Sequence, residues 1–175
     1  IATTSAGVAW SCGWPDGDQL PADEMIGAVR RILRVANLPV TVDIEEGCSD
    51  DPGEVAALVA TLVDAGVAGI NIEDGSKSPD LLVAKLKAIR ETLGGRDLFI
   101  NSRTDVYLRG MATGDAAVEE VTRRGKRYID AGIQEFELYA KAPLFAGRKP
   151  KFVYFGGGTP SYLSVSQLTS LTDRM

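Results

Sequence analysis

The sequence predicts an α/β fold in which short parallel strands alternate with amphipathic helices. Short apolar runs of strand length recur along the chain, and segments with apolar residues every three or four positions separate them. A strand that is followed by a crossover helix returns to its sheet as a parallel neighbour. We count about five such βα units. The chain has 175 residues, and a closed eight-unit barrel typically takes about 250, so the sequence predicts a partial (β/α) barrel.

Five segments have the length and composition of strands. They are residues 1–5, 39–45, 69–74, 98–104 and 151–155. Helical spacing of apolar residues covers about 25–36, 55–63, 82–93 and 115–140, and a capping box starts another helix at Ser164. Asp51-Pro52 and Ser78-Pro79 are typical helix starts, and Gly66 and Gly94 are placed as helix stops.

The segment 133–140 is ambiguous. The phrase Asp130-Ala131-Gly132-Ile133 repeats Asp64-Ala65-Gly66-Val67, where a helix ends and a strand begins, so a strand is one interpretation. The helical stripe nevertheless continues through Gly132 without losing phase, and a long helix can absorb the cost of about 1 kcal/mol for an interior glycine. We favour one helix from about Asp115 to Ala140.

Composition indicates an acidic globular protein without nucleic-acid or membrane partners. The net charge is −5, 45% of the residues are hydrophobic and 25% are charged. No extended basic patch and no apolar run of about 20 residues stands out. The only cysteines, Cys12 and Cys48, do not make a disulfide framework, which fits a cytoplasmic location, and we expect both to be structural. With no histidine, a Ser-His-Asp triad and a histidine-ligated zinc are excluded.

Acidic residues recur where the predicted strands end. Ligand sites of parallel α/β folds lie at the carboxyl ends of the strands. Several carboxylates without histidine or thiolate suit a hard cation, Mg²⁺ or alternatively Mn²⁺. Arg103 would then bind an anionic substrate, and the backbone of Ser5, Ala6 and Gly7 would bind another anionic oxygen. The acids that we expect to converge are Asp16, Asp43, Glu45 and Glu73.

Four motifs resemble the phosphoenolpyruvate mutase/isocitrate lyase superfamily, and its phosphonomutase-like branch in particular. They are TTSAGVAWSCGWPDGD, TVDIEEG, GINIEDG and INSRTDVYL, which together cover about residues 1–132. The resemblance implies a (β/α)₈ barrel, usually with a helix swapped between subunits, and a homo-oligomer. It also implies Mg²⁺-dependent binding of small α-oxo or α-hydroxy carboxylates, and lyase, mutase or hydrolase chemistry that makes or breaks C–C or P–C bonds.

The resemblance also assigns roles to individual residues. It implies that Asp43 holds Mg²⁺ with Asp16, Glu45 and Glu73 around it, and we expect Asp16 and Arg103 to take part in catalysis. Ser5, Ala6 and Gly7 would line the site of the substrate carboxylate, and Arg103 would contact the substrate. The chain departs from the lyase branches after the third of these motifs. Where those enzymes carry a loop with a catalytic cysteine, this sequence has Gly75-Ser76-Lys77-Ser78.

A second resemblance begins near residue 128. The segment YIDAGIQEFELYAKAPLFAGRKPKFVYFGGGTPSYLSVSQL is similar to coproporphyrinogen oxidase-like radical-SAM enzymes. The resemblance implies a turn at Gly156, Gly157 and Gly158 that contacts S-adenosylmethionine. The cluster-binding cysteines of that family are absent, so no iron–sulfur cluster is expected. We interpret the chain as a single chimera-like α/β domain, with a phosphonomutase-like part over 1–132 and a radical-SAM-like βα segment over 133–175.

Three functional hypotheses follow from these resemblances. The first is a Mg²⁺-dependent enzyme that acts on a small oxo-acid. The second is a catalytically inactive chimeric or truncated barrel scaffold, which dimerises through its exposed sheet edges. The third is a residual ligand-binding module that uses the Gly156–Gly158 turn.

Overall fold

The computed structural model describes the backbone of residues 1–141 and the side chains of residues 1–131. The chain divides into two compact units, Ile1–Arg103 and a second that begins at Thr104. The first unit contains the sheet, and the second contains one long helix. Three sequence predictions lie outside the described residues: the strand at 151–155, the turn at Gly156–Gly158 and the helix that starts at Ser164.

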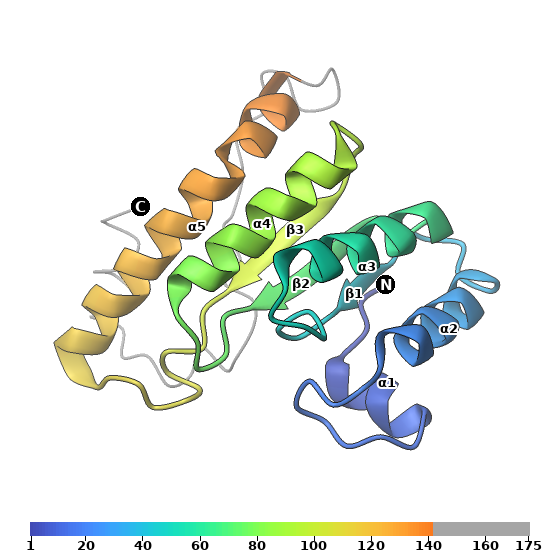
Figure 1. The fold of residues 1–175 in the computed structure, drawn as a ribbon, viewed down its shortest axis with the longest axis horizontal. Coiled ribbons are helices and arrows are strands. Elements are labelled where there is room, and N and C mark those ends of the chain that lie inside the picture. Colours follow the sequence, from blue (N-terminus) through green and yellow to red (C-terminus); the bar gives the residue numbers. More distant parts are fainter. Residues whose placement is uncertain (142–175) are drawn as a thin grey trace. The chain divides into compact units, whose positions relative to one another are not determined.

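A parallel three-stranded sheet forms the centre of the first unit (Figure 1). Its order is β1-β2-β3, with bounds Thr41–Asp43, Gly69–Glu73 and Phe99–Arg103. The N-terminal segment joins the other side of β1 through a single parallel bridge between Ala2 and Thr41. The parallel sheet confirms the predicted α/β class, whereas the count of five βα units stays a prediction.

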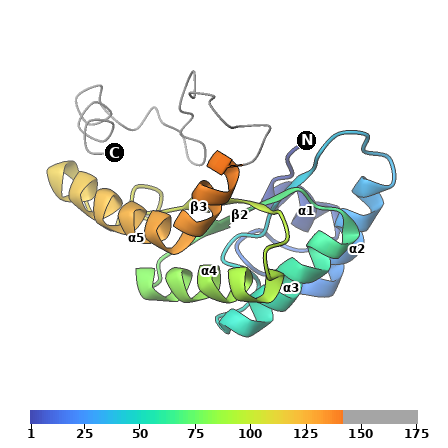
Figure 2. The same cartoon turned by 90° about the horizontal axis from the view of Figure 1, so that it is seen from above.

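Helices α3 and α4 make the two crossovers between these strands. Helix α3 (Pro52–Ala65) joins β1 to β2, and α4 (Pro79–Leu93) joins β2 to β3. The two helices pack against each other and lie on one side of the strands (Figure 2). Their ends confirm the predicted caps, because Asp51 and Ser78 accept backbone hydrogen bonds at the starts and Gly66 and Gly94 end the helices with positive φ.

The first predicted strand is shorter than expected. Helix α1 (Ser5–Ser11) begins at Ser5, because Thr4 acts as its N-cap and accepts a hydrogen bond from the backbone of Gly7. The expectation of a strand over residues 1–5 is therefore wrong beyond the bridge at Ala2. Helix α2 (Ala22–Leu33) follows and packs against α3.

The core of the first unit lies between the sheet and helices α3 and α4. Side chains of β1 and β2 that are at most 1% exposed face buried residues of the two helices. The strand residues are Val42, Ile70 and Ile72, and the helix residues are Val55, Val59, Leu62, Leu82, Leu86 and Ile89. At about 25 cal/mol per Å² of apolar area removed from water, burial of this kind is the main stabilising contribution to the fold.

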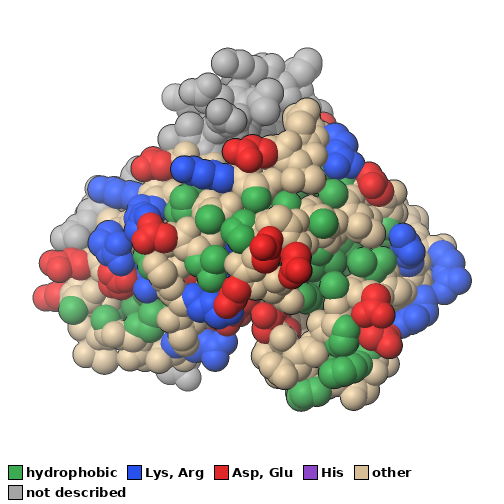
Figure 3. Space-filling view, viewed as in Figure 1, with side chains coloured by type: hydrophobic (Ala, Val, Ile, Leu, Met, Phe, Trp, Pro, Cys, Tyr) green, Lys and Arg blue, Asp and Glu red, His purple; other side chains and the backbone are tan. Residues whose placement is uncertain are grey.

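Hydrophobic side chains also show on the surface over α1 (Figure 3), where Trp10 and the following Trp14 are exposed.

The second unit is described through one helix, α5, which spans Gly114–Lys141. The continuous helix decides the ambiguous segment 133–140 in favour of helix. Arg123 and Arg124 both bond the Glu120 carboxylate within this helix and lower its pKa to about 2. Within the described residues, no helix is both long and apolar enough to cross a membrane.

Candidate functional site

One face of the sheet is polar, and the opposite face is apolar. Successive side chains of a strand point to opposite faces. Ile70 and Ile72 therefore belong to the face that packs on the helices, whereas Asn71 and Glu73 belong to the other face. The parallel register aligns further polar residues with these two, so that the polar face carries Asp43, Asn71, Glu73, Asn101 and Arg103. Three of them, Asp43, Glu73 and Arg103, are predicted site residues.

Glu73 and Arg103 form an ion pair across β2 and β3. They are register partners at the carboxyl ends of the two strands. The side chain of Glu73 is 5% exposed and that of Arg103 is 17% exposed, so the pair is shielded from solvent. Arg103, which is predicted to bind substrate, thus neutralises Glu73, which is predicted to surround the metal.

Asp43 stands at the end of β1 and accepts two hydrogen bonds through the same oxygen. Asn71 donates its Nδ2 to Asp43 Oδ1 over 3.1 Å, and the backbone N–H of Glu45 donates to Oδ1 over 3.2 Å. The backbone N–H of Asp43 donates in turn to Thr3 Oγ1 at 3.0 Å. The Asp43 carboxylate is therefore held from two sides.

Glu45 lies beyond the strand, contrary to the sequence expectation. Strand β1 ends at Asp43, and Glu45 has a left-handed φ of 52°, which a strand does not tolerate. The predicted strand over residues 39–45 therefore ends two residues early, at Asp43. Burial raises the pKa of Glu45, and so do the negative charges of Asp16, Asp18 and Asp43. Asp16, Asp18 and Asp43 thus lie close enough to repel the Glu45 carboxylate, although Asp16 itself is exposed.

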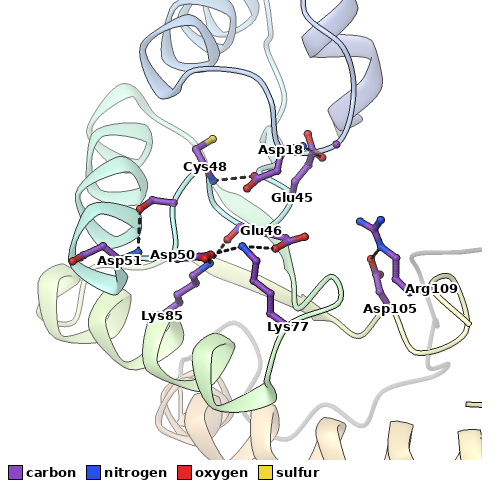
Figure 4. A network of polar contacts seen from close by, with 12 residues as sticks. Asp18, Glu45, Glu46, Cys48, Asp50, Asp51, Lys77, Lys85, Asp105 and Arg109 are labelled. Carbon is purple, nitrogen blue, oxygen red and sulfur yellow. Dashed lines mark hydrogen bonds and ion pairs between the residues drawn. The ribbon is translucent and has the colours of Figure 1, made fainter. Parts of the chain in front are cut away.

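Asp18 also belongs to this group, although it is not among the predicted site residues. Its backbone N–H donates to Glu45 Oε2 at 2.5 Å, and its Oδ1 accepts from the backbone N–H of Cys48 at 3.0 Å (Figure 4). Burial raises the pKa of Asp18. The motif Pro15-Asp16-Gly17-Asp18 offered a choice of two acids, and spacing alone did not show which would be buried.

A buried lysine fixes the loop that follows β1. Lys85 of α4 is only 2% exposed. Its Nζ donates to the backbone carbonyl oxygen of Glu46 at 2.7 Å and lies 3.8 Å from Asp50 Oδ1. Lys77 pairs with both Glu46 and Asp50 (Figure 4). Burial lowers the pKa of Lys85, and the positive charge of Lys77 lowers it further. Gly75 permits this packing, because a Cβ there would overlap the Glu46 carboxylate.

The segment predicted to bind an anionic oxygen forms the first turn of α1. Ser5, Ala6 and Gly7 are helical, and the backbone N–H of Gly7 donates to Thr4 Oγ1 at 3.2 Å. That amide is therefore already bonded within the cap. The turn at Gly156–Gly158 lies outside the described residues, and its predicted ligand stays a prediction.

The donor set suits a hard cation in its chemistry. Carboxylates of Asp16, Asp18, Asp43 and Glu45 supply only oxygen, and a cation among them would relieve the repulsion that, together with burial, raises the pKa of Glu45. Among the residues that the structure describes, no three acids or thiols stand at the spacing of a formed metal centre. Of these four acids, Asp18, Asp43 and Glu45 take part in hydrogen bonds, and the ion pair with Arg103 belongs to Glu73.

Residues 1–136 match the family described as phosphoenolpyruvate phosphomutase. The chain belongs to this family. The match includes all four motifs at the strand ends and confirms the resemblance to the phosphoenolpyruvate mutase/isocitrate lyase superfamily. The resemblance to radical-SAM enzymes concerns residues 128–175, which lie almost wholly beyond this match, and it stays a prediction.

Curated relatives include lyases of the same superfamily. The chain is 40% identical over 137 residues to an uncharacterized protein of Mycobacterium tuberculosis, covering 75% of this chain and 49% of that protein. It is 32% identical over 149 residues to 2-methylisocitrate lyase of Escherichia coli, covering 77% of this chain and 48% of the lyase. The chain thus spans about half the length of the curated relatives that it matches.

Solved structures agree with this family. A phosphonomutase-like protein of Burkholderia cenocepacia superposes with a TM-score of 0.70 at 35% identity, over 75% of this chain and 56% of that protein. A phosphonopyruvate hydrolase in complex with oxalate and Mg²⁺ superposes with a TM-score of 0.66 at 22% identity, over 75% of this chain and 47% of the hydrolase. The second likeness shows a shared fold.

We predict that Lys85→Met lowers the free energy of unfolding by about 1–3 kcal/mol, because it leaves the Glu46 carbonyl without its buried donor. Urea unfolding followed by circular dichroism measures the change. Lys87→Met in the same helix is the matched control, since Lys87 is exposed. A Lys85→Met chain as stable as the control would contradict the anchoring role.

We predict that the Cys48 thiol reacts slowly with iodoacetamide at pH 8. Burial raises its pKa from 9.0 to about 12, and the charges of Asp18 and Glu45 contribute. Each pKa unit changes the fraction of thiolate about tenfold, so the reactive thiolate of Cys48 is roughly a thousandfold scarcer than that of an ordinary cysteine. Peptide mass spectrometry of the native and the urea-unfolded chain measures the rates, and equal rates would contradict the shift.

Proposed function

We propose that this chain is a Mg²⁺-dependent protein of the phosphonomutase/isocitrate lyase type that binds small α-oxo or α-hydroxy carboxylates. The observation that carries the proposal is the gathering of Asp16, Asp18 and Asp43 around Glu45 near the carboxyl end of β1, where burial and the charges of these three acids raise the pKa of Glu45. Membership of a family with lyase and mutase members supports C–C or P–C bond chemistry as its activity.

Asp43 and Glu45 would hold the metal, with Glu73 as a further ligand. A bound Mg²⁺ would stabilise the negative charge that develops on a substrate oxygen. Mn²⁺ has the same ligand preference and is an alternative. The Glu73 carboxylate is available to a cation only to the extent that it leaves its ion pair with Arg103.

Arg103 would bind the substrate carboxylate. Its guanidinium is mostly shielded from solvent and lies at the carboxyl end of β3 beside the acids of the polar face. A planar guanidinium binds a carboxylate through two parallel hydrogen bonds, which fixes the orientation of the substrate. We assign catalytic proton transfer to Asp16, which lies close enough to Glu45 to raise its pKa and is open to solvent. The first turn of α1, Ser5 to Gly7, would contact the other end of the substrate.

A second candidate function is a catalytically inactive scaffold that dimerises. Within the described residues, β3 pairs only with β2, and Phe99 at its start is 54% exposed. An open strand edge is a template for pairing with another chain. The carboxylates are also already engaged in hydrogen bonds and an ion pair, as they would be in a structural role.

We predict that Asp43→Ala abolishes or weakens Mg²⁺ binding by at least about 100-fold, since loss of an outer partner alone typically costs 10- to 100-fold. Isothermal titration calorimetry with and without oxalate measures the affinity. Asp97→Ala is the matched control, because Asp97 is exposed and precedes β3 at its opposite end. Absence of Mg²⁺ binding by the unaltered chain, with and without oxalate, would refute the proposed metal site.

The scaffold candidate predicts a dimer whose mass does not depend on Mg²⁺ or oxalate. Light scattering coupled to size-exclusion chromatography measures the mass without additions, with Mg²⁺, and with Mg²⁺ and oxalate. Phe99→Lys introduces a charge at the open edge and is expected to shift the chain towards monomer. A monomeric mass for the unaltered chain would exclude this candidate.

A further inference from the structure

We propose that Asn71 and Asn101 form a hydrogen-bonded ladder across the sheet that orients the Asp43 carboxylate, and that both are positioning residues of the metal site. The ladder itself follows from the described contacts. Its effect on metal affinity rests on the proposed function, because that proposal makes Asp43 a metal ligand.

The ladder follows the register of the sheet. Asp43 pairs with Asn71, and Asn71 pairs with Asn101, so the three residues stand side by side on successive strands. Asn101 Nδ2 donates to Asn71 Oδ1 at 2.5 Å, and Asn71 Nδ2 donates to Asp43 Oδ1 at 3.1 Å. All three side chains are half-buried on the polar face.

The chemistry of the groups fixes the direction of the ladder. An ionised carboxylate can only accept hydrogen bonds, so Asn71 must turn its amide nitrogen towards Asp43. Its oxygen then faces Asn101, which must donate. Each amide thereby determines the orientation of the next, and the whole chain of donors ends on one oxygen of Asp43.

The same oxygen receives the backbone N–H of Glu45. Two donors on Oδ1 restrict rotation of the carboxylate about its last bond. Oδ2 is then the oxygen that can bind a cation without breaking the ladder. Because a ligand held in its binding orientation loses less conformational entropy on binding, the ladder should strengthen metal binding.

The residue types speak against a purely structural role for the two amides. Asparagine is depleted in strands, and it occurs here in the middle of both β2 and β3. The chain's other asparagine, Asn37, lies exposed in a loop. A strand that needed only packing would have an apolar or β-branched residue at these positions.

A double-mutant cycle on Mg²⁺ affinity tests the ladder. The variants are Asn71→Leu, Asn101→Leu and the two together, since leucine has a similar size and lacks the donors. Asn37→Leu is the matched control. Calorimetry gives the Mg²⁺ dissociation constant in the presence of oxalate, and thermal unfolding shows that each variant is folded.

We expect Asn71→Leu to weaken Mg²⁺ binding by about 10-fold or more, the lower end of the effect of outer-shell partners, and Asn101→Leu to weaken it several-fold. Because Asn101 acts only through Asn71, adding Asn101→Leu to Asn71→Leu should cause no further loss. A merely structural residue would instead give losses that add. Additive losses, or affinities equal to those of the Asn37→Leu control, would overturn the positioning role while leaving the metal site intact.

A metal-free measurement separates failure of the ladder from failure of the proposed function. We expect the side-chain amide NMR signals of Asn71 to move in Asp43→Ala, and those of Asn101 to move with them, while the signals of Asn37 stay unchanged. If the unaltered chain does not bind Mg²⁺ but these shifts occur, the proposed function fails and the ladder stands. Signals of Asn71 that do not respond to Asp43→Ala would refute the ladder itself.

Discussion

The buried ammonium group of Lys85 holds the loop after β1 in place by donating to the carbonyl of Glu46. The site geometry depends on this contact, because the loop contains residues with left-handed backbone at Glu45, Gly47 and Cys48. Two of them carry side chains that disfavour that conformation. The hydrogen bond from the buried Lys85 ammonium stabilises this conformation of the loop, because losing it would leave the ammonium with only the more distant Asp50 carboxylate, at 3.8 Å. In this loop conformation the Glu45 carboxylate accepts the hydrogen bond from the backbone N–H of Asp18.

Positively charged side chains compensate several of the acids near the ends of β1 and β2. Arg103 neutralises Glu73 on the sheet, and Lys77 and Lys85 neutralise Glu46 and Asp50 beside it. The group formed by Asp16, Asp18, Asp43 and Glu45 is compensated less completely: Lys77 and Lys85 lower the pKa of Asp18, whereas burial and the three neighbouring acids raise the pKa of Glu45. This excess of negative charge around Glu45 is the electrostatic argument for the proposed metal site.

Much of the fold could be predicted from the sequence because it depends on local signals. Helices α3 and α4 are bounded by Asp51, Ser78, Gly66 and Gly94, which satisfy or release backbone groups at the helix ends. Strands β2 and β3 were predicted to within one residue. The predicted site residues Asp43, Glu73 and Arg103 do share one polar face, because parallel register aligns strand ends irrespective of loop detail.

The remaining features depend on contacts between residues far apart in the chain. The turn at Glu45 is stabilised by Asp18, 27 residues away, and by Lys85 through the neighbouring carbonyl, so no local pattern announces it. Asn71 and Asn101 are not among the predicted site residues, because the prediction rested on charged side chains and an amide carries no charge. The signal was nevertheless present, since a polar amide in the middle of an apolar strand needs a partner.

The close approach of Gly75 to Glu46 has a consequence for how this protein can change in evolution. Any side chain at position 75 would occupy the volume of the Glu46 carboxylate and would also have to adopt a φ of 53°. A larger residue there requires the Glu46 carboxylate to turn away or position 46 to become smaller, and either change would disturb the pairing of Glu46 with Lys77. A glycine at position 75 therefore preserves the ion pair that Lys77 makes beside the loop.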